Sequence, residues 1–159
     1  MTLKTGLGYD IHPLAPGRRF VLGGIEIPHS KGTAGHSDGD ALVHAIIDAL
    51  LGALGEGDIG GLFPDSDPRT LDISSLKLLE DVMARLRKAG GKIVNLDTVV
   101  VVEEPRIGPH AGRMKEALGS VLGLAGKSLN IKAKTNELLG PVGKGEAVAC
   151  WAVALVEFP

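Results

Sequence analysis

The chain has 159 residues, of which 44% are hydrophobic and 23% charged, a composition typical of a packed globular protein and unlike that of a disordered chain. Its 17 Lys and Arg and 19 Asp and Glu give a formal net charge of -2, and only 3% of its residues are aromatic. Without a general basic field or aromatic stacking surfaces, the sequence argues against a nucleic-acid partner.

The first part of the chain carries strand and turn signals. Its pattern predicts a strand over residues 3–12, which we expect Pro13 to end. Residues 20–27 are typical of a hairpin arm, broken at Gly23 and Gly24, where backbone freedom permits a bulge or a turn.

The first helix is predicted from about residue 40 to residue 54, with Ser37 or Asp38 as its cap and Gly55 and Gly57 as its stop. It is apolar around most of its circumference, so we expect neighbours to cover it on several sides. Only three residues interrupt this apolar surface, at a spacing that places them along one stripe: Asp40, His44 and Asp48.

The remaining elements set the fold class. We expect an ordered loop over residues 58–68, helices over 74–89 and 109–122, and strands over 93–102, 129–134 and 147–158. The alternation predicts an α+β fold in which residues 1–159 form a single domain, with a mixed four-stranded sheet and helices on one face. The last strand has little polar alternation, so both its faces are expected to be covered, one of them by a subunit interface.

Two features bear on where the chain works. Its single cysteine, Cys150, cannot form an internal disulfide and stands in an apolar run. The N-terminal stretch lacks the pattern of a secretory signal, and the longest apolar run, residues 147–156, is about half the length of a bilayer span. We therefore expect a soluble cytoplasmic protein with no membrane partner.

Asp10 and His12 are candidate metal ligands at the end of the first strand. Alternate residues of a strand project from the same face, so this carboxylate and this imidazole converge. His44 is the best candidate for a third ligand, because an unpaired imidazole is costly to bury on so apolar a helix. Three such ligands are typical of a zinc site with one position open for a substrate oxygen. Taken singly, each histidine is more often a surface or hydrogen-bonded residue.

Asp48 lies one helical turn after His44 and has two interpretations. It can accept the second ring N–H of His44 and so fix the tautomer of the imidazole, or it can face solvent. The same two interpretations hold for Asp40.

Two glycine-rich stretches are candidate phosphate-binding loops. Residues 6–8 (GLG) lack the third glycine of the dinucleotide fingerprint and precede the candidate ligands, so we reject a Rossmann fold. Within residues 132–146, Thr135 and backbone N–H groups can hold phosphate oxygens, while Glu137 can coordinate a hard divalent cation. The alternative is a glycine-rich connection between two strands.

Further polar residues flank the first helix. Four of them can bind the hydroxyl groups of a polyol or can serve as caps and turn formers: His36, Ser37, Asp58 and Asp65. Residues 104–109 (EPRIGP) follow a buried strand and are rigid enough to form the wall of a pocket.

Four segments in chain order carry a resemblance to a known family: GLGYDIHPL, GTAGHSDGDALVHAIIDALLGA, GDIGGLFPDSDP and NIKAKTNELLGPVGKGEAVA. Over essentially its whole length, the sequence resembles the 2-C-methyl-D-erythritol 2,4-cyclodiphosphate synthase family. The resemblance implies conversion of 4-diphosphocytidyl-2-C-methyl-D-erythritol 2-phosphate to the cyclic diphosphate with release of CMP, in the non-mevalonate route to isoprenoids. It also implies a homotrimer with active sites between neighbouring subunits.

The resemblance further implies the metals and the reacting groups. Zinc is expected on Asp10, His12 and His44, and a Mg²⁺ or Mn²⁺ ion that bridges the substrate diphosphate is expected on Glu137. His36 and Thr135 are implied as transition-state stabilisers. The nucleophile is then the substrate's own 2-phosphate, which agrees with the lack of any Ser/His/Asp or Cys/His arrangement in the sequence.

Substrate contacts are implied for two groups of residues. Around the first helix, where the methylerythritol phosphate is expected, they are Asp10, Ile11, His12, His36, Ser37, Asp58, Ile59, Gly60, Phe63 and Asp65. Around the last three strands, where cytidine and the phosphates are expected, they are Val102, Pro105, Arg106, Ile107, Gly108, Lys134, Thr135, Asn136, Glu137, Pro141 and Lys144. An open zinc site would also permit a zinc-dependent diphosphate hydrolase or a non-catalytic trimer that binds a metal and a nucleotide.

Overall fold

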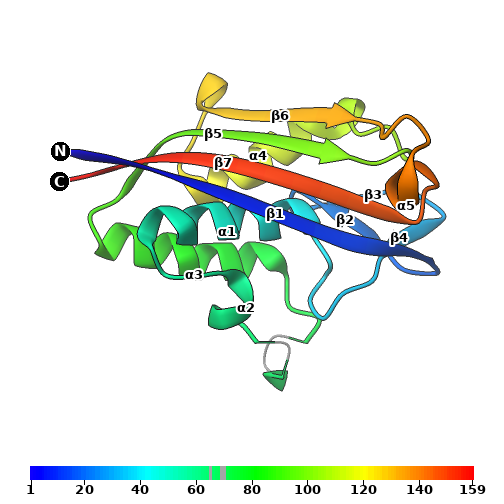
Figure 1. The fold of residues 1–159 in the computed structure, drawn as a ribbon, viewed down its shortest axis with the longest axis horizontal. Helices are drawn as coiled ribbons and strands as arrows, with labels where there is room; N and C mark the ends of the chain where they lie inside the picture. The colour runs from blue at the N-terminus through cyan, green and yellow to red at the C-terminus, as the bar shows by residue number, and fades with distance from the viewer. Residues whose placement is uncertain (65, 69–70) are drawn as a thin grey trace.

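A twisted mixed β-sheet carries the fold (Figure 1). The computed structural model describes residues 1–64, 66–68 and 71–159. Five strands pair in the order β4-β1-β7-β5-β6, and within this sheet only β5 and β6 run parallel. Their bounds are β1 Thr2–Pro16, β4 Lys31–Thr33, β5 Lys92–Val101, β6 Leu129–Lys134 and β7 Ala147–Phe158. The expected mixed sheet is confirmed, but the expected number of four strands is wrong.

The fifth strand exists because Pro13 does not end β1. Residues up to Pro13 pair with β7, and Leu14–Pro16 then pair with β4 on the opposite edge of β1. Pro13 lies at this change of partner, where its carbonyl accepts a hydrogen bond from the N–H of Ala34 (2.9 Å). Its missing N–H therefore interrupts no continuous ladder, and a proline is tolerated at such a position.

A separate hairpin follows β1. It consists of β2 (Phe20–Leu22) and β3 (Ile25–Ile27), which are antiparallel and joined by Gly23 and Gly24. Both glycines have positive φ (59° and 77°), as a two-residue hairpin turn requires. The glycine pair thus forms a turn between two arms and not a bulge within one arm.

Asp40 joins this hairpin to the first helix. Its buried carboxylate accepts hydrogen bonds from the N–H groups of Gly23 (2.9 Å), Gly24 (2.6 Å) and Val43 (3.0 Å). Burial raises the pKa of Asp40, although these three N–H groups oppose the shift. Asp40 is therefore the cap of the first helix, and neither predicted cap, Ser37 nor Asp38, has this role.

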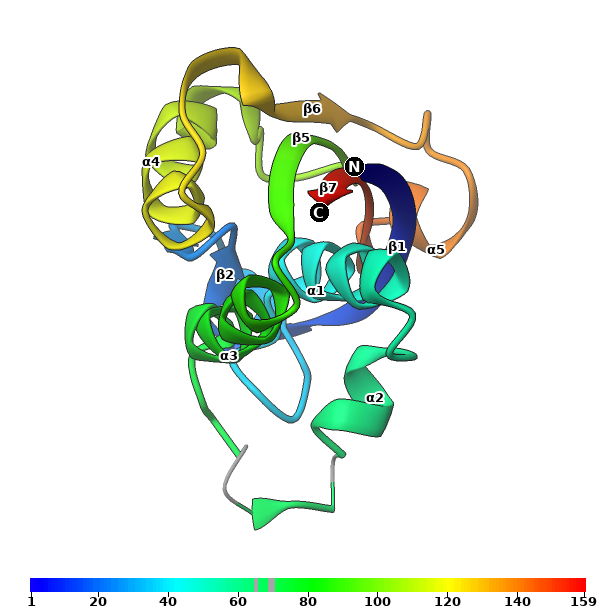
Figure 2. The same cartoon turned by 90° about the vertical axis from the view of Figure 1, so that its left-hand side faces the viewer.

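The helices lie mainly on one side of the sheet, as expected, with α1, α3 and α4 together on that side (Figure 2). Their bounds are α1 Ala41–Leu54, α2 Ile59–Leu62, α3 Ser75–Lys88, α4 Ala111–Leu122 and α5 Gly140–Gly143, with short 3₁₀ turns at Gly108–His110 and Gly126–Ser128. Helix α1 is buried between β1, β7 and α3, which confirms that neighbours cover it on several sides. No helix within the described ranges has the length and apolar character of a membrane span.

Most of the remaining predicted boundaries are correct. β6 and β7 match the predicted residues, β5 lies one residue earlier than predicted, and α3 ends at Lys88, one residue early. Helix α4 begins two residues late because the 3₁₀ turn precedes it. Residues 58–68, expected as a loop, include the one-turn helix α2, which Asp58 caps by accepting a hydrogen bond from the N–H of Gly61 (2.8 Å).

Helix α1 lies in backbone contact with β1 because of two glycines. A Cβ atom on Gly6 would lie 1.7 Å from the carbonyl oxygen of Ala49, and one on Gly8 would lie 1.8 Å from that of Ala45. Only glycine permits so close an approach. Both glycines share one face of β1 with the next alternate residue, Asp10, which therefore also faces α1.

The opposite face of β1 and β7 is apolar and exposed in the single chain. Its exposed side chains include Leu7, Tyr9, Ile11, Trp151 and Val153. The rings of Tyr9 and Trp151 lie side by side, with centroids 4.9 Å apart. Within one chain, the expectation that both faces of the last strand are covered is therefore not met.

We predict that Gly8→Ala destabilises the fold and weakens metal binding. Its Cβ must push α1 away from β1, and overpacking of this kind costs about 3 kcal/mol. His44 moves with the helix, so zinc affinity should fall along with the free energy of unfolding, both measurable by titration and denaturation.

Gly112→Ala is the matched control for this substitution. Gly112 lies in α4 with no atom near its added Cβ, so stability should be unchanged or raised by about 0.5–1 kcal/mol. Equal behaviour of the two variants would contradict the role assigned to Gly8.

Candidate active site

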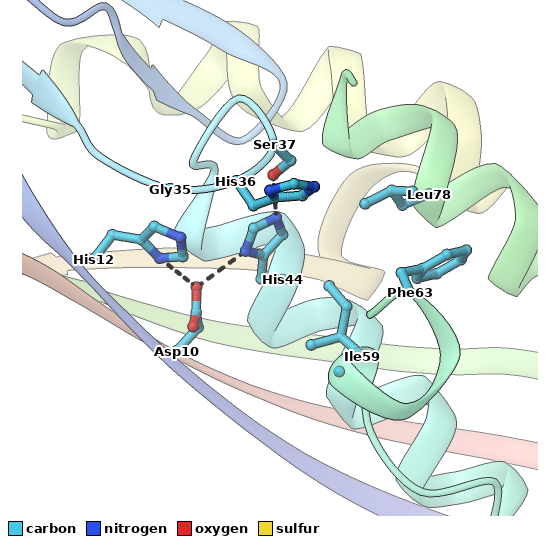
Figure 3. Close-up of a pocket in the computed structure, with 10 residues that line it drawn as sticks. Asp10, His12, Gly35, His36, Ser37, His44, Ile59, Phe63 and Leu78 are labelled. Atoms are coloured by element: carbon cyan, nitrogen blue, oxygen red, sulfur yellow. Dashed lines mark hydrogen bonds and ion pairs between the residues drawn. The ribbon is translucent and has the colours of Figure 1, made fainter. Parts of the chain in front are cut away.

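Three candidate metal ligands converge at one pocket (Figure 3). Asp10 and His12 come from β1, and His44 comes from α1. Oδ2 of Asp10 lies 2.8 Å from Nδ1 of His12 and 3.2 Å from Nδ1 of His44. One potential ligand atom from each residue lies within 4.8 Å of the others. The predicted convergence of a carboxylate and two imidazoles is confirmed.

The electrostatics of this cluster suit a cation. Burial alone would raise the pKa of Asp10, but the adjacent imidazoles of His12 and His44 lower it to about 2. Burial alone would lower the pKa of His44, but contact with Asp10 raises it. The carboxylate is thus ionised at neutral pH and favours positive charge between these residues.

Nδ1 of His12 supplies a direct test of the metal assignment. It is buried and makes no hydrogen bond of acceptable geometry within the described part of the chain, although Oδ2 of Asp10 lies close to it. A buried polar atom without such a bond is costly. A divalent metal held by one carboxylate and two imidazoles would satisfy it, and this set of donors is typical of zinc. The residues present therefore fit the metal.

The second ring nitrogen of His44 binds two hydroxyl groups and not Asp48, which was one of the two interpretations of that residue. Nε2 lies 2.9 Å from Oγ of Ser75 and 3.0 Å from Oγ of Ser37. Asp48 instead accepts a hydrogen bond from the N–H of Ile59 (2.8 Å), which ties α1 to the start of α2. Burial raises the pKa of Asp48, and that hydrogen bond opposes the shift.

Asp38 completes this arrangement and fixes the tautomer of His44. Oγ of Ser75 donates a short hydrogen bond to Asp38, and the Ser75 N–H donates another (2.9 Å). The Ser75 hydroxyl must then accept a hydrogen bond from Nε2–H of His44. In the neutral imidazole Nδ1 is then the unprotonated nitrogen, which is the form that binds a metal. Sequence reasoning missed both residues, because Ser75 is 31 positions from His44 and had been assigned only to the start of a helix.

The pocket in front of the triad has a volume of about 280 Å³. It is lined by Asp10, His12, Gly35, His36, Ser37, His44, Ile59, Gly60, Phe63 and Leu78. The structure therefore brings five further predicted contact residues to the triad: His36, Ser37, Ile59, Gly60 and Phe63. Gly35 and Leu78 were not predicted. A side chain at Gly35 would collide with the ring of His12, at 2.7 Å from its Nε2.

Two other residues predicted for this region, Ile11 and Asp58, lie outside the pocket. Ile11 is exposed on the opposite face of β1 from Asp10. Asp58 caps α2 and does not line the pocket. Asp65 lies outside the described residues.

A second pocket, of about 360 Å³, lies where the parallel strands β5 and β6 end. Its lining includes seven residues predicted to contact the substrate: Val102, Pro105, Arg106, Ile107, Gly108, Lys134 and Thr135. Asn136 and Glu137 follow directly, and Oγ1 of Thr135 donates a hydrogen bond to Glu137 (3.1 Å). Pro141 lies in α5, and Lys144 lines a third pocket beside the second.

The two pockets share no lining residue. In the sheet register, Asp10 pairs with Cys150, Cys150 with Val100, and Val100 with Ala133. Three strand spacings, about 14 Å along the sheet, therefore separate the row of Asp10 from the strand that precedes Thr135. One chain does not bring Thr135 or Glu137 to the metal triad.

The fold and the site together define the class of protein. It is an α+β protein in which one strand and one helix direct a carboxylate and two imidazoles into a pocket, a candidate metal site. The model of the YgbB family matches residues 3–157, and the chain belongs to this family.

Named relatives agree with this assignment. The chain is 51% identical over 153 residues to a 2-C-methyl-D-erythritol 2,4-cyclodiphosphate synthase of Caldicellulosiruptor bescii, covering 96% of this chain and 98% of that protein. A solved structure of such a synthase in a CDP-bound form has a TM-score of 0.90 and 37% identity, covering 97% of this chain and 100% of the other. The bifunctional IspDF of Campylobacter jejuni has a TM-score of 0.94 and 34% identity, covering 99% of this chain, which spans 43% of that protein.

We predict that Ser75→Ala weakens zinc binding about tenfold, because His44 loses one acceptor that fixes its tautomer. Ser37 remains as a partner, so the Ser37→Ala/Ser75→Ala double variant should lose more, up to about 100-fold. Competitive titration with a chelator measures both affinities.

Ser74→Ala is the control for this substitution. Ser74 precedes α3 without making a side-chain capping hydrogen bond, so its removal should leave zinc affinity unchanged. A Ser75→Ala variant with the affinity of the parent would contradict the role assigned to Ser75.

Proposed function

We propose that the chain converts 4-diphosphocytidyl-2-C-methyl-D-erythritol 2-phosphate to 2-C-methyl-D-erythritol 2,4-cyclodiphosphate and CMP. This is a phosphorus–oxygen lyase reaction of the non-mevalonate route to isoprenoid precursors, and we place it in the cytoplasm. Residues 1–159 would form one synthase domain. The observation that carries the proposal is the Asp10, His12 and His44 triad, directed into a pocket of a chain that belongs to the YgbB family.

The reaction needs no nucleophile from the protein. An oxygen of the substrate's 2-phosphate forms a bond to the β-phosphorus, and the bond from that phosphorus to the bridging oxygen breaks. The bridging oxygen leaves with CMP, so the atoms of the substrate are divided between two products without water. The protein has to align the attacking oxygen with the β-phosphorus and stabilise the charge on the transferring group.

Residues of the first pocket would hold the methylerythritol end. Asp10, His12 and His44 would hold a zinc ion, which when bound neutralises charge on the β-phosphate and polarises its P–O bonds. His36, at the pocket wall, would stabilise negative charge in the transition state. Ser37 and Gly60 also line this pocket and would contact the substrate.

Residues of the second pocket would hold the nucleotide. Its wall, which includes Pro105, Arg106 and Ile107, would receive cytidine. Thr135 would bind a phosphate oxygen, and Glu137 would hold a Mg²⁺ or Mn²⁺ ion, which would neutralise charge on the diphosphate. The hydrogen bond between Thr135 and Glu137 keeps the two side chains adjacent.

A homotrimer would unite the two pockets. The distance along the sheet between Asp10 and the β6 end favours a substrate bound between the first pocket of one subunit and the second pocket of its neighbour. The exposed apolar face around Tyr9 and Trp151 would be covered in such an assembly, since large exposed apolar patches commonly mark interfaces.

The central test is product analysis of the parent and of His44→Ala. Phosphorus NMR should detect the cyclic diphosphate together with CMP for the parent. His44→Ala should lose zinc and at least about 100-fold in turnover, because positioning and charge stabilisation both depend on the site.

His29→Ala, which removes a histidine outside the first pocket, serves as the control and should retain zinc. A linear phosphate released by water would identify a hydrolase. Binding of CDP and zinc without any turnover would identify a non-catalytic protein. Full activity of zinc-free His44→Ala would contradict the mechanism.

Glu137→Gln tests whether the two metal sites are separable. It should retain zinc, because Glu137 is not part of the triad. Its half-saturating Mg²⁺ or Mn²⁺ concentration should rise by about tenfold, since a neutral amide replaces a ligand that hard cations favour. Metal analysis combined with a divalent-cation titration of CMP release checks both statements.

A further inference from the structure

The loop after β6 has an unusual backbone. Glu137 and Leu138 both have positive φ (51° and 62°), and Gly140 follows with a φ of 64°. Positive φ is uncommon for non-glycine residues and persists only where the surroundings impose it. Thr135 and Glu137, the two residues proposed to act on the phosphates, lie in this stretch, so what imposes its shape also positions them.

Glu103 makes the contacts that hold the loop from outside. Its Oε1 accepts hydrogen bonds from the N–H of Asn136 (2.7 Å) and from the N–H of Leu138 (3.3 Å). The intervening N–H, that of Glu137, is directed to Oγ1 of Thr135 (3.4 Å). One carboxylate oxygen thus receives two N–H groups that flank Glu137. Hydrogen bonds to an ionised acceptor are stronger than those between neutral groups.

The sheet explains why Glu103 can reach this loop. β5 and β6 run parallel and pair in register up to Val101 and Lys134. The N–H of Val102 continues the pairing, because it donates to the carbonyl of Lys134 (3.0 Å). The two chain segments therefore leave the sheet side by side. Glu103 is the next residue, and it lines both the second pocket and the neighbouring third pocket.

Other contacts close the loop from within but do not replace Glu103. Asn136 and Leu139 exchange two hydrogen bonds, Nδ2 to O (2.7 Å) and N to O (2.9 Å). Gly143 lies against Leu138, where an added Cβ would be 2.2 Å from its carbonyl carbon. None of these contacts satisfies the N–H of Leu138 or that of Asn136.

We propose that Glu103 is a positioning residue: its carboxylate, joined to the N–H groups of Asn136 and Leu138, holds Thr135 and Glu137 in the arrangement that serves the diphosphate. Glu103 also stands next to the wall proposed to receive cytidine, so it fixes the phosphate loop relative to the nucleotide pocket. This inference rests on the proposed function for its catalytic consequence. Its structural part stands on the hydrogen bonds alone.

Glu103→Ala and Glu103→Gln provide the test. The alanine variant leaves two N–H groups without their acceptor, while glutamine keeps an oxygen that can accept both. Amide hydrogen exchange over residues 135–139 should be at least about 10-fold faster in Glu103→Ala than in the parent and should largely recover in Glu103→Gln.

We expect two functional measurements to rank the parent, Glu103→Gln and Glu103→Ala in the same order. Titration of Mn²⁺ in the presence of CDP should show about 10-fold weaker binding for Glu103→Ala, with near-parental binding for Glu103→Gln. The kcat for CMP release should fall by a similar factor, while zinc content and melting temperature stay close to those of the parent. Glu116→Ala, which removes an exposed carboxylate on α4, should change none of these quantities.

Unchanged amide exchange in Glu103→Ala would overturn the proposal, whatever the activity. Equal loss of Mn²⁺ affinity in the alanine and glutamine variants would also overturn it, because the charge and not the hydrogen bonds would then matter. A parent that makes no cyclic diphosphate would contradict the proposed function, while the exchange and Mn²⁺ measurements would still decide the role of Glu103.

Discussion

The close approach of α1 to β1 is the constraint on which the site depends. Gly6 and Gly8 remove the side chains that would otherwise separate the helix from the strand, so the two backbones meet at Ala45 and Ala49. A helix held at ordinary side-chain distance would carry its histidine away from the strand. Because Asp10 continues the glycine face of β1, the same packing that buries α1 delivers an imidazole to a carboxylate.

Next to this contact between α1 and β1, buried polar side chains form a series of hydrogen bonds. Asp38 accepts a hydrogen bond from the Ser75 hydroxyl, Ser75 accepts one from Nε2–H of His44, and Nδ1 of His44 faces Asp10. Nδ1 of His44 and the carboxylate of Asp10 lie 3.2 Å apart and favour positive charge between them, either as a proton on the imidazole or as a metal ion. The hydrogen bonds on one side of the imidazole thereby direct its other nitrogen toward the carboxylate of Asp10, where a metal ion could be held. Asp40 contributes from a different direction, because it fixes the start of α1 and the β2–β3 turn together.

Local patterns predicted most of the fold, because strand and helix periodicity are properties of neighbouring residues. The same reasoning failed where a long-range contact decided the outcome. Pro13 was expected to end β1, but a change of partner strand makes its missing N–H harmless. Asp38 was expected to cap a helix, but a serine 37 positions later uses its carboxylate.

The site shows the same division between local and distant information. Strand periodicity alone placed Asp10 and His12 on one face, and the apolar helix made His44 conspicuous. No local signal identified Ser75 as its partner, and the glycines at positions 6 and 8 were considered only as a failed nucleotide fingerprint. Their role is evident only once the carbonyl groups of α1 lie against them. The family resemblance of the four sequence segments predicted what periodicity could not. It assigns Glu137 to the same active site as the metal triad, although one chain does not bring them together.

The parallel pair of strands in the five-stranded sheet, β5 and β6, determines the geometry of the second pocket. Antiparallel neighbours send their following loops to opposite ends of a sheet, whereas β5 and β6 release theirs at the same end. The N–H groups of Asn136 and Leu138, on either side of Glu137, then donate to Glu103 of the adjacent loop, so the shape of one loop is set by the other. The metal triad, three strands away, is built by a different device, the glycine contact. The proposed homotrimer would complete the site with a neighbouring subunit, because an interface can align two rigid halves without deforming either.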